Sequence, residues 1–163
     1  MKSAKKQEVK VSELKTNEKK WTKDLWNSGW TGIPTVIIER QQKLGLDEPD
    51  INILLHIISY WWKSEDKPWP SKVTIAKAMK RNPRTIQKRI AQIEKDKLIR
   101  REYRGGESGK GSKSNLYHLE GLIKAALPLA AEKVAKAAER RAVLAAAAKN
   151  KGKSKFKVVE IDE

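Results

Sequence analysis

The stretch "TIAKAMKRNPRTIQKRI" (Thr74–Ile90) contains two helical segments separated by a break. Asn82 is a good N-cap and Pro83 is preorganised for a first helical position, so the proline starts a second helix. In that helix, apolar residues recur at i, i+4 and i+7, as Ile86, Ile90 and Ile93, and predict the buried face. Lys and Arg occupy much of the remainder, and the stretch holds no Asp or Glu. It therefore predicts a helix, a sharp turn and a second helix with a positively charged exposed face.

The flanking segments complete a small domain. Acids and a proline in "DEPDINILLHIISYWW" mark the start of a central helix near Asp47. Beyond the second helix, Leu98–Arg104 and Ser114–Leu119 are predicted strands, joined by the glycine-rich loop Gly105–Lys113. Helix, helix and hairpin is the order of a winged helix-turn-helix. We predict a mainly α fold with a small β-hairpin wing, followed by an Ala-rich C-terminal helix and flexible tails.

The predicted domains are a disordered basic arm (1–20), a winged helix-turn-helix domain (21–119), a helical extension (120–150) and a flexible tail (151–163). Two local features leave alternatives. The β-branched Thr35–Arg40 fits either a short strand or the start of a helix. Pro128 predicts a kink or a fresh helix start near Leu127.

The tryptophans at positions 21, 26 and 30 surround short polar spacers. Packing onto the domain is the favoured interpretation, and a partner-binding segment is the alternative.

Charge is the main functional signal in the composition. The net charge of the whole chain is +16, and residues 71–113 contribute +10 of it, which predicts a polyanion-binding surface there. There is no cysteine, so disulfides and thiolate metal sites are excluded. The most apolar window, Ile53–Trp62, is about half the ~20 residues of a membrane helix, and no secretory signal follows the basic N-terminus. We expect a soluble, cytoplasmic, nucleoid-associated protein without a membrane partner.

The segments 31–62 and 70–104 resemble the winged helix-turn-helix proteins of bacterial plasmids, phages and other mobile elements. The family pattern has a small residue in the first helix, Thr and a β-branched residue early in the second, and an apolar–Glu pair before the exit to the wing. The matching residues here are Ala76, Thr85, Ile86, Ile93, Glu94, Leu98 and Ile99. Some relatives of this fold help to start replication and others regulate transcription.

The chain departs from that family pattern at two turns. Lys80 stands where glycine is usual between the helices, and Lys97 where glycine is usual before the wing strand. A non-glycine residue at positive φ costs on the order of 1 kcal/mol, a tolerable amount.

The charged face predicts a duplex-DNA interface, with a merely solvated basic face as the alternative. The B-DNA major groove admits one α-helix, whose N-terminal turns read base edges. Base reading is assigned to Arg84, Gln87, Lys88 and Ala91, with Arg84 or Lys88 on guanine and Gln87 on adenine. Phosphate contacts are assigned to Lys72, Lys77, Lys80, Arg81, Thr85, Lys95, Lys110 and Lys113.

Catalytic and cofactor functions find no support in the sequence. Aligning Gly109-Lys110 with a phosphate-binding P-loop puts Arg104 where its first glycine belongs, and a strand follows instead of a helix. A packed or half-exposed role is favoured over a ligand role for His56 and His118. We expect no enzyme activity, no metal and no cofactor.

Two segments are candidates for protein contacts. In the Ala-rich helix, Val134, Ala137, Ala138 and Leu144 would contact a second copy, whereas a single exposed helix is the alternative. The tail "KFKVVEIDE" would add a strand to a partner protein, would fold its acids back on the chain's own DNA face as a competitor, or is a poorly ordered terminus. The leading hypothesis is a sequence-specific transcriptional regulator of a mobile element. The alternative is a replication or partition accessory protein that binds origin or centromere-like repeats. A third hypothesis is an interaction module in which the winged helix contacts protein.

Overall fold

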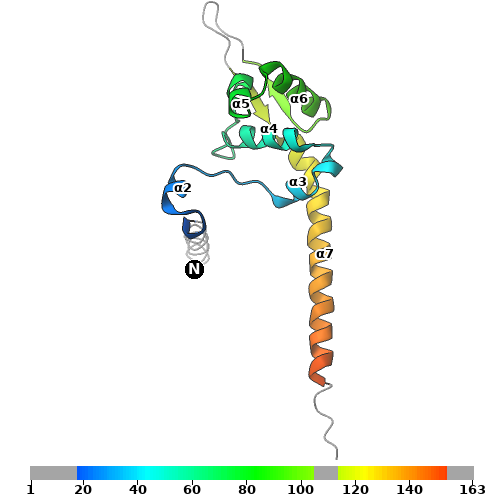
Figure 1. Cartoon of the computed structure of the whole chain (residues 1–163). Coiled ribbons are helices and arrows are strands. Elements are labelled where there is room, and N and C mark those ends of the chain that lie inside the picture. Colours follow the sequence, from blue (N-terminus) through cyan, green and yellow to red (C-terminus); the bar gives the residue numbers. More distant parts are fainter. Residues whose placement is uncertain (1–17, 105–113, 154–163) are drawn as a thin grey trace, which may run out of the picture.

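A computed structural model describes residues 18–104 and 114–153 of the chain, and it has the predicted mainly α fold with a two-stranded antiparallel hairpin (Figure 1). The helices and strands are α2 Lys23–Asn27, α3 Thr35–Glu39, the 3-10 helix η1 Gln41–Leu44, α4 Glu48–Ile58, α5 Lys72–Ala78, α6 Pro83–Lys95, β1 Arg100–Glu102, β2 Leu116–His118 and α7 Glu120–Lys153. Helices α4, α5 and α6 cluster beside the hairpin, while α7 runs away from this cluster as a long shaft.

Helix α4 is the central helix of the domain, as its sequence predicts. Asp47 caps its N-terminus in a capping box with Asp50, and a proline occupies the first turn. Ile53, Leu54 and Ile57 are fully buried, so one face of the helix lies in the core.

The two helices of the opening stretch also begin where the sequence predicts. The Ser71 side chain accepts a hydrogen bond from the backbone N–H of Thr74, at the start of α5. Asn82 caps α6 by accepting from the backbone N–H of Arg84 at 2.8 Å. The buried face of α6 consists of Ile86, Ile90 and Ile93, each 1% exposed. Their burial leaves the opposite face of α6 to solvent.

Lysines occupy the left-handed position after both helices. Lys80 has φ 48° and Lys97 has φ 61°. Each is followed by a backbone bond that closes the last turn, from Arg81 N to Ala76 O at 2.9 Å and from Leu98 N to Ile93 O at 3.1 Å. The 3-10 helix η1 ends with the same pattern around Gly45, at φ 72°. The two turns thus keep the geometry that glycine usually provides.

Replacing Lys97 with glycine should therefore stabilise the domain by about 1 kcal/mol, because the left-handed strain disappears. Urea unfolding followed by circular dichroism measures the change. Lys95→Gly is the matched control: Lys95 lies in the last turn of α6, where glycine should destabilise by about 1 kcal/mol. A loss of stability in both variants would contradict the proposed strain.

Backbone hydrogen bonds tie the hairpin to the segment before α5, and tie the helix that follows the hairpin to the end of α6. The hairpin register pairs Arg100 with His118 and Glu102 with Leu116, and the N–H of Tyr117 donates to Pro68 O at 2.9 Å. Helix α7 then enters the core beside the end of α6, where the N–H of Leu122 donates to Leu98 O at 2.6 Å. Gly121 permits this approach: a Cβ there would lie 2.0 Å from Lys97 O.

The structure answers two questions that the sequence left open and extends the core beyond one predicted boundary. Thr35–Glu39 is helical, which settles the alternative left open by its β-branched residues. No fresh helix starts near Leu127, since α7 continues through Pro128 in an Ala-rich sequence that favours helix on both sides. The core also extends past the predicted boundary at residue 119, because Leu122 and Ala126 of α7 are buried in it.

Most of the predicted arm (1–20) and tail (151–163) lies outside the described residues. Among the helices that the structure describes, none is long and apolar enough to span a membrane.

Candidate nucleic-acid interface

The exposed face of α6 carries all four residues predicted to read bases. Arg84, Gln87, Lys88 and Ala91 are exposed and share the helix with the buried isoleucines. Thr85 and Lys95, predicted to contact phosphates, are exposed as well. The N-terminal turns of α6 therefore combine a fixed apolar face with a solvent face of hydrogen-bond donors.

Helix α5 and the turn after it extend this cationic surface. Lys72, Lys77, Lys80 and Arg81 are all exposed. Across the described part of the chain, six cations on the two helices and their turn form no ion pair: Lys77, Lys80, Arg81, Arg84, Lys88 and Lys95. Their charges are not neutralised by neighbouring carboxylates, so they are available to an anionic partner.

Arg89 does not belong to this surface, although it lies on the same helix. Its guanidinium bonds Asp47 at 2.7 Å and Asp50 at 3.0 Å, the two carboxylates of the α4 capping box. The hydrogen bonds that its guanidinium donates to these carboxylates raise the pKa of Arg89. Burial raises the pKa of Asp50, the less exposed of the two acids. Arg89 thus ties α6 to α4 and fixes the orientation of the exposed face.

Arg101 ties the wing to α6, as Arg89 ties α6 to α4. Its Nε donates to a carboxylate oxygen of Glu94 at 2.8 Å, and its backbone N–H donates to the other oxygen at 2.7 Å. Burial works to raise the pKa of Glu94, but these hydrogen bonds lower it overall. Strand β1 is therefore fixed against α6. Glu94 belongs to the apolar–Glu pattern seen in the sequence, whereas nothing in the sequence identified its partner.

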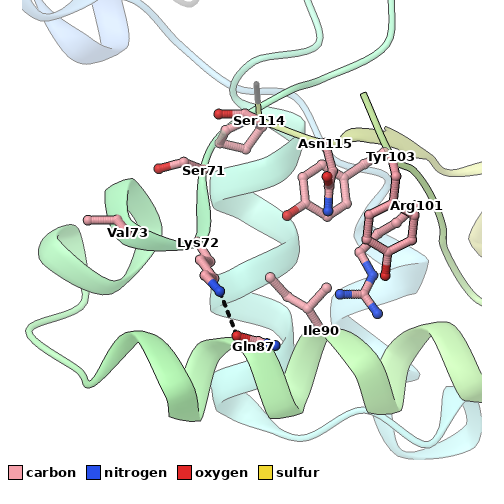
Figure 2. Close-up of a pocket in the computed structure, with 11 residues that line it drawn as sticks. Ser71, Lys72, Val73, Gln87, Ile90, Arg101, Tyr103, Ser114 and Asn115 are labelled. Carbon is pink, nitrogen blue, oxygen red and sulfur yellow. Dashed lines mark hydrogen bonds between the residues drawn. The ribbon is translucent and has the colours of Figure 1, made fainter. Parts of the chain in front are cut away.

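A hollow of about 440 Å³ lies between α5, α6 and the wing (Figure 2). Lys72 and Gln87 line one side, where the lysine ammonium donates to the glutamine amide oxygen at 2.6 Å. Tyr103 and Asn115 line the wing side. Arg104 donates to Ser114 O at 2.7 Å and closes the base of the wing. The hollow joins the exposed face of α6 to the base of the wing.

The wing lysines and the two histidines are the remaining residues that the sequence analysis considered. Lys110 and Lys113 lie outside the described residues. His118 is buried and bonds Glu102 at 2.8 Å, a packed position that agrees with the favoured interpretation. His56 is half-buried. Within residues 18–104 and 114–153, no group of three His, Asp or Glu side chains could hold a metal ion.

The tryptophans near the N-terminus do not pack into the core. Trp26 and Trp30 stack with ring centroids 5.1 Å apart, but Trp21 is 57% exposed and Trp30 is 65% exposed. Trp26 and Trp30 instead line a hollow with Ile58 and Trp61 at the end of α4, so the predicted packing onto the domain holds in part for these two and not for the exposed Trp21.

The dimer candidates on α7 are accessible. Val134 and Leu144 are each 70% exposed, and Ala137 and Ala138 are exposed too. The last ion pair that ties α7 to the domain joins Lys133 to Glu39 at 2.6 Å. Beyond it, the described side chains of α7 face solvent.

Comparison with known proteins gives a family for this arrangement. The model of the DnaD N-terminal domain matches residues 33–137. Among solved structures, the N-terminal domain of DnaD protein from Geobacillus kaustophilus HTA426 is 19% identical, with a TM-score of 0.49 over 70% of this chain and 92% of that one. S. aureus MepR in a complex with DNA is 16% identical, with a TM-score of 0.41 over 71% and 89%. No curated protein matches the sequence. Since the family match spans more than half of the sequence, from α3 through the hairpin into α7, the chain belongs to the DnaD N-terminal domain family.

Proposed function

We propose that this chain is a sequence-specific duplex-DNA-binding protein and not an enzyme. The observation that carries the proposal is the two-sided character of α6. One side is locked into the core by three isoleucines, and the other presents exposed cations that lack carboxylate partners in the described chain. Such a helix can enter a groove without any change in the core.

Each part of the surface has a role in this proposal. Arg84 and Lys88 project from the first turns of α6, where they would donate to guanine O6 and N7 in the major groove. Lys77, Lys80, Arg81 and Lys95 would neutralise phosphates. Four such contacts predict that the logarithm of affinity falls with the logarithm of salt concentration with a slope of roughly −4.

Selection of duplexes from a randomised library tests the proposal. The full chain should enrich one sequence and bind it more tightly than competitor DNA, with the stated salt dependence. Equal affinity for all duplexes, or none for any, would overturn it. If the chain binds no duplex, the result would favour the remaining hypothesis, in which the winged helix contacts another protein and not DNA.

Two biological roles share this chemistry: regulation of mobile-element genes, and accessory work at a replication origin or partition site. Membership of the DnaD N-terminal domain family lends some support to the replication role. Mapping the bound DNA across the native genome separates the two. Repeated, spaced sites near an origin support the replication role, whereas one palindrome over a promoter supports regulation. Either outcome would place the protein at the nucleoid.

We expect the exposed face of α7 to form a weak dimer that DNA strengthens, since protein two-fold symmetry mirrors a palindromic or repeated site. Val134→Asp combined with Leu144→Asp should abolish that dimer and leave the fold intact, because both side chains are 70% exposed. Sedimentation with and without the selected duplex measures the mass. An identical monomer mass for the parent chain and the variant under both conditions would remove this contact from the proposal.

A further inference from the structure

Lys72 and Gln87 form a pair within the hollow beside the wing, and the pair carries an inference that rests on the proposed DNA binding. The ammonium of Lys72, at the start of α5, donates to Oε1 of Gln87, in the second turn of α6, at 2.6 Å. Both side chains are exposed, and Figure 2 shows the bond bridging the two helices. Among the residues that the structure describes, Gln87 is the one predicted base-reading residue that a side chain of another helix holds.

The chemistry of the pair fixes the orientation of the amide. A lysine ammonium has three donors and no acceptor, so only the carbonyl oxygen of glutamine can bond it. The amide nitrogen of Gln87, with its two N–H donors, then lies on the other side of the group. The pair presents N–H donors from Gln87 and the remaining N–H donors of Lys72.

That donor pattern changes the base that Gln87 fits. An unrestrained glutamine suits adenine, because it donates to N7 and accepts from the N6 amino group. With Lys72 on the oxygen, an approaching adenine would bring its amino protons next to a positive ammonium. Guanine offers two acceptors, O6 and N7, on the same edge. The pair therefore fits guanine better than adenine.

We propose that Lys72 is a positioning residue that makes Gln87 select guanine, instead of a lysine that only contacts phosphate. The proposal revises two predictions from the sequence, the phosphate role of Lys72 and the adenine preference of Gln87. Neither revision could come from the sequence, because the two residues lie on different helices and fifteen positions apart.

Lys72→Met tests this inference, because methionine keeps an unbranched apolar stem and removes the ammonium. The full chain and each variant are taken through selection from the same randomised duplex library. Gln87→Ala identifies the base pair that Gln87 contacts, as the position at which the preference disappears. At that position the parent chain should prefer guanine, and Lys72→Met should shift the guanine-to-adenine ratio towards adenine on the order of 10-fold, the size of one bidentate contact.

Lys77→Met is the matched control, since Lys77 is exposed on the same helix and lacks an ion pair among the described residues. It should weaken binding to all sequences alike and reduce the salt slope by roughly 1, without changing base preference. In the Gln87→Ala background, Lys72→Met should no longer alter the preference, which shows that it acts through Gln87.

Two results would overturn the inference while duplex binding stands. One is a Lys72→Met variant that behaves like Lys77→Met, with uniform weakening and unchanged preference. The other is a parent chain that prefers adenine at the position read by Gln87. If the parent chain selects no sequence at all, the proposed DNA recognition fails, and this inference fails with it.

Discussion

Gly121→Ala is expected to destabilise the domain by about 3 kcal/mol or more, at the upper end of overpacking effects. A Cβ at this position would lie 2.0 Å from Lys97 O and 2.9 Å from Leu98 O. Both obstacles are backbone atoms, so no side-chain rotation relieves them. Helix α7 would have to move away from the α6–β1 junction, losing the bond from Leu122 to Leu98 and part of the burial of Ala126.

Thermal unfolding followed by circular dichroism measures this effect. A loss of that size lowers the melting temperature by more than about 10 °C in a domain of this length. Gly45→Ala provides the control, because Gly45 has φ +72° and no atom within 4 Å of an added Cβ. It should lose only about 1 kcal/mol from backbone strain. Equal losses in the two variants would show that the close approach at Gly121 is unimportant.

Arg84→Ala and Lys88→Ala form the second prediction, which concerns binding. If either side chain makes a bidentate base contact, its loss should cost about 1–3 kcal/mol at the selected site, or roughly 5- to 150-fold in affinity. Binding to unrelated duplexes should fall much less, because the cations that are proposed to contact phosphates are unchanged in these variants. Titrations of the selected duplex and of a scrambled one measure both quantities.

Arg89→Met is the control for this experiment. Arg89 lies next to Lys88 in the sequence, but it points to Asp47 and Asp50 on α4. Its replacement should lower stability, since it leaves the partly buried Asp50 without its cation, while the folded protein keeps its base preference. Placement of α6 in the groove would be wrong if Arg84→Ala and Lys88→Ala retained full affinity and preference.

Local signals explain why much of the fold was predictable from the sequence. Ser71 and Asn82 cap their own helices, and the spacing of the isoleucines gives the buried face of α6 directly. Lys80 and Lys97 adopt positive φ as the family pattern implied, because each turn is closed by hydrogen bonds to the helix just before it. These are interactions between residues only a few positions apart.

The contacts that shape the interface were not predictable in the same way. Arg89 bonds carboxylates 39 and 42 positions away, and Lys133 reaches Glu39 across 94 positions. A helical wheel assigns such cations to solvent because it contains no neighbouring element. The same limit applies to Gly121, whose importance comes from backbone atoms of the turn between α6 and β1.

The projecting part of α7 has a mechanical consequence. After Lys133 the helix continues to Lys153, a distance of about 30 Å at 1.5 Å per residue. Its first turns are held rigidly in the core by Leu122 and Ala126. A small rotation of the domain would therefore displace the far end of α7 by a greater distance than its first turns.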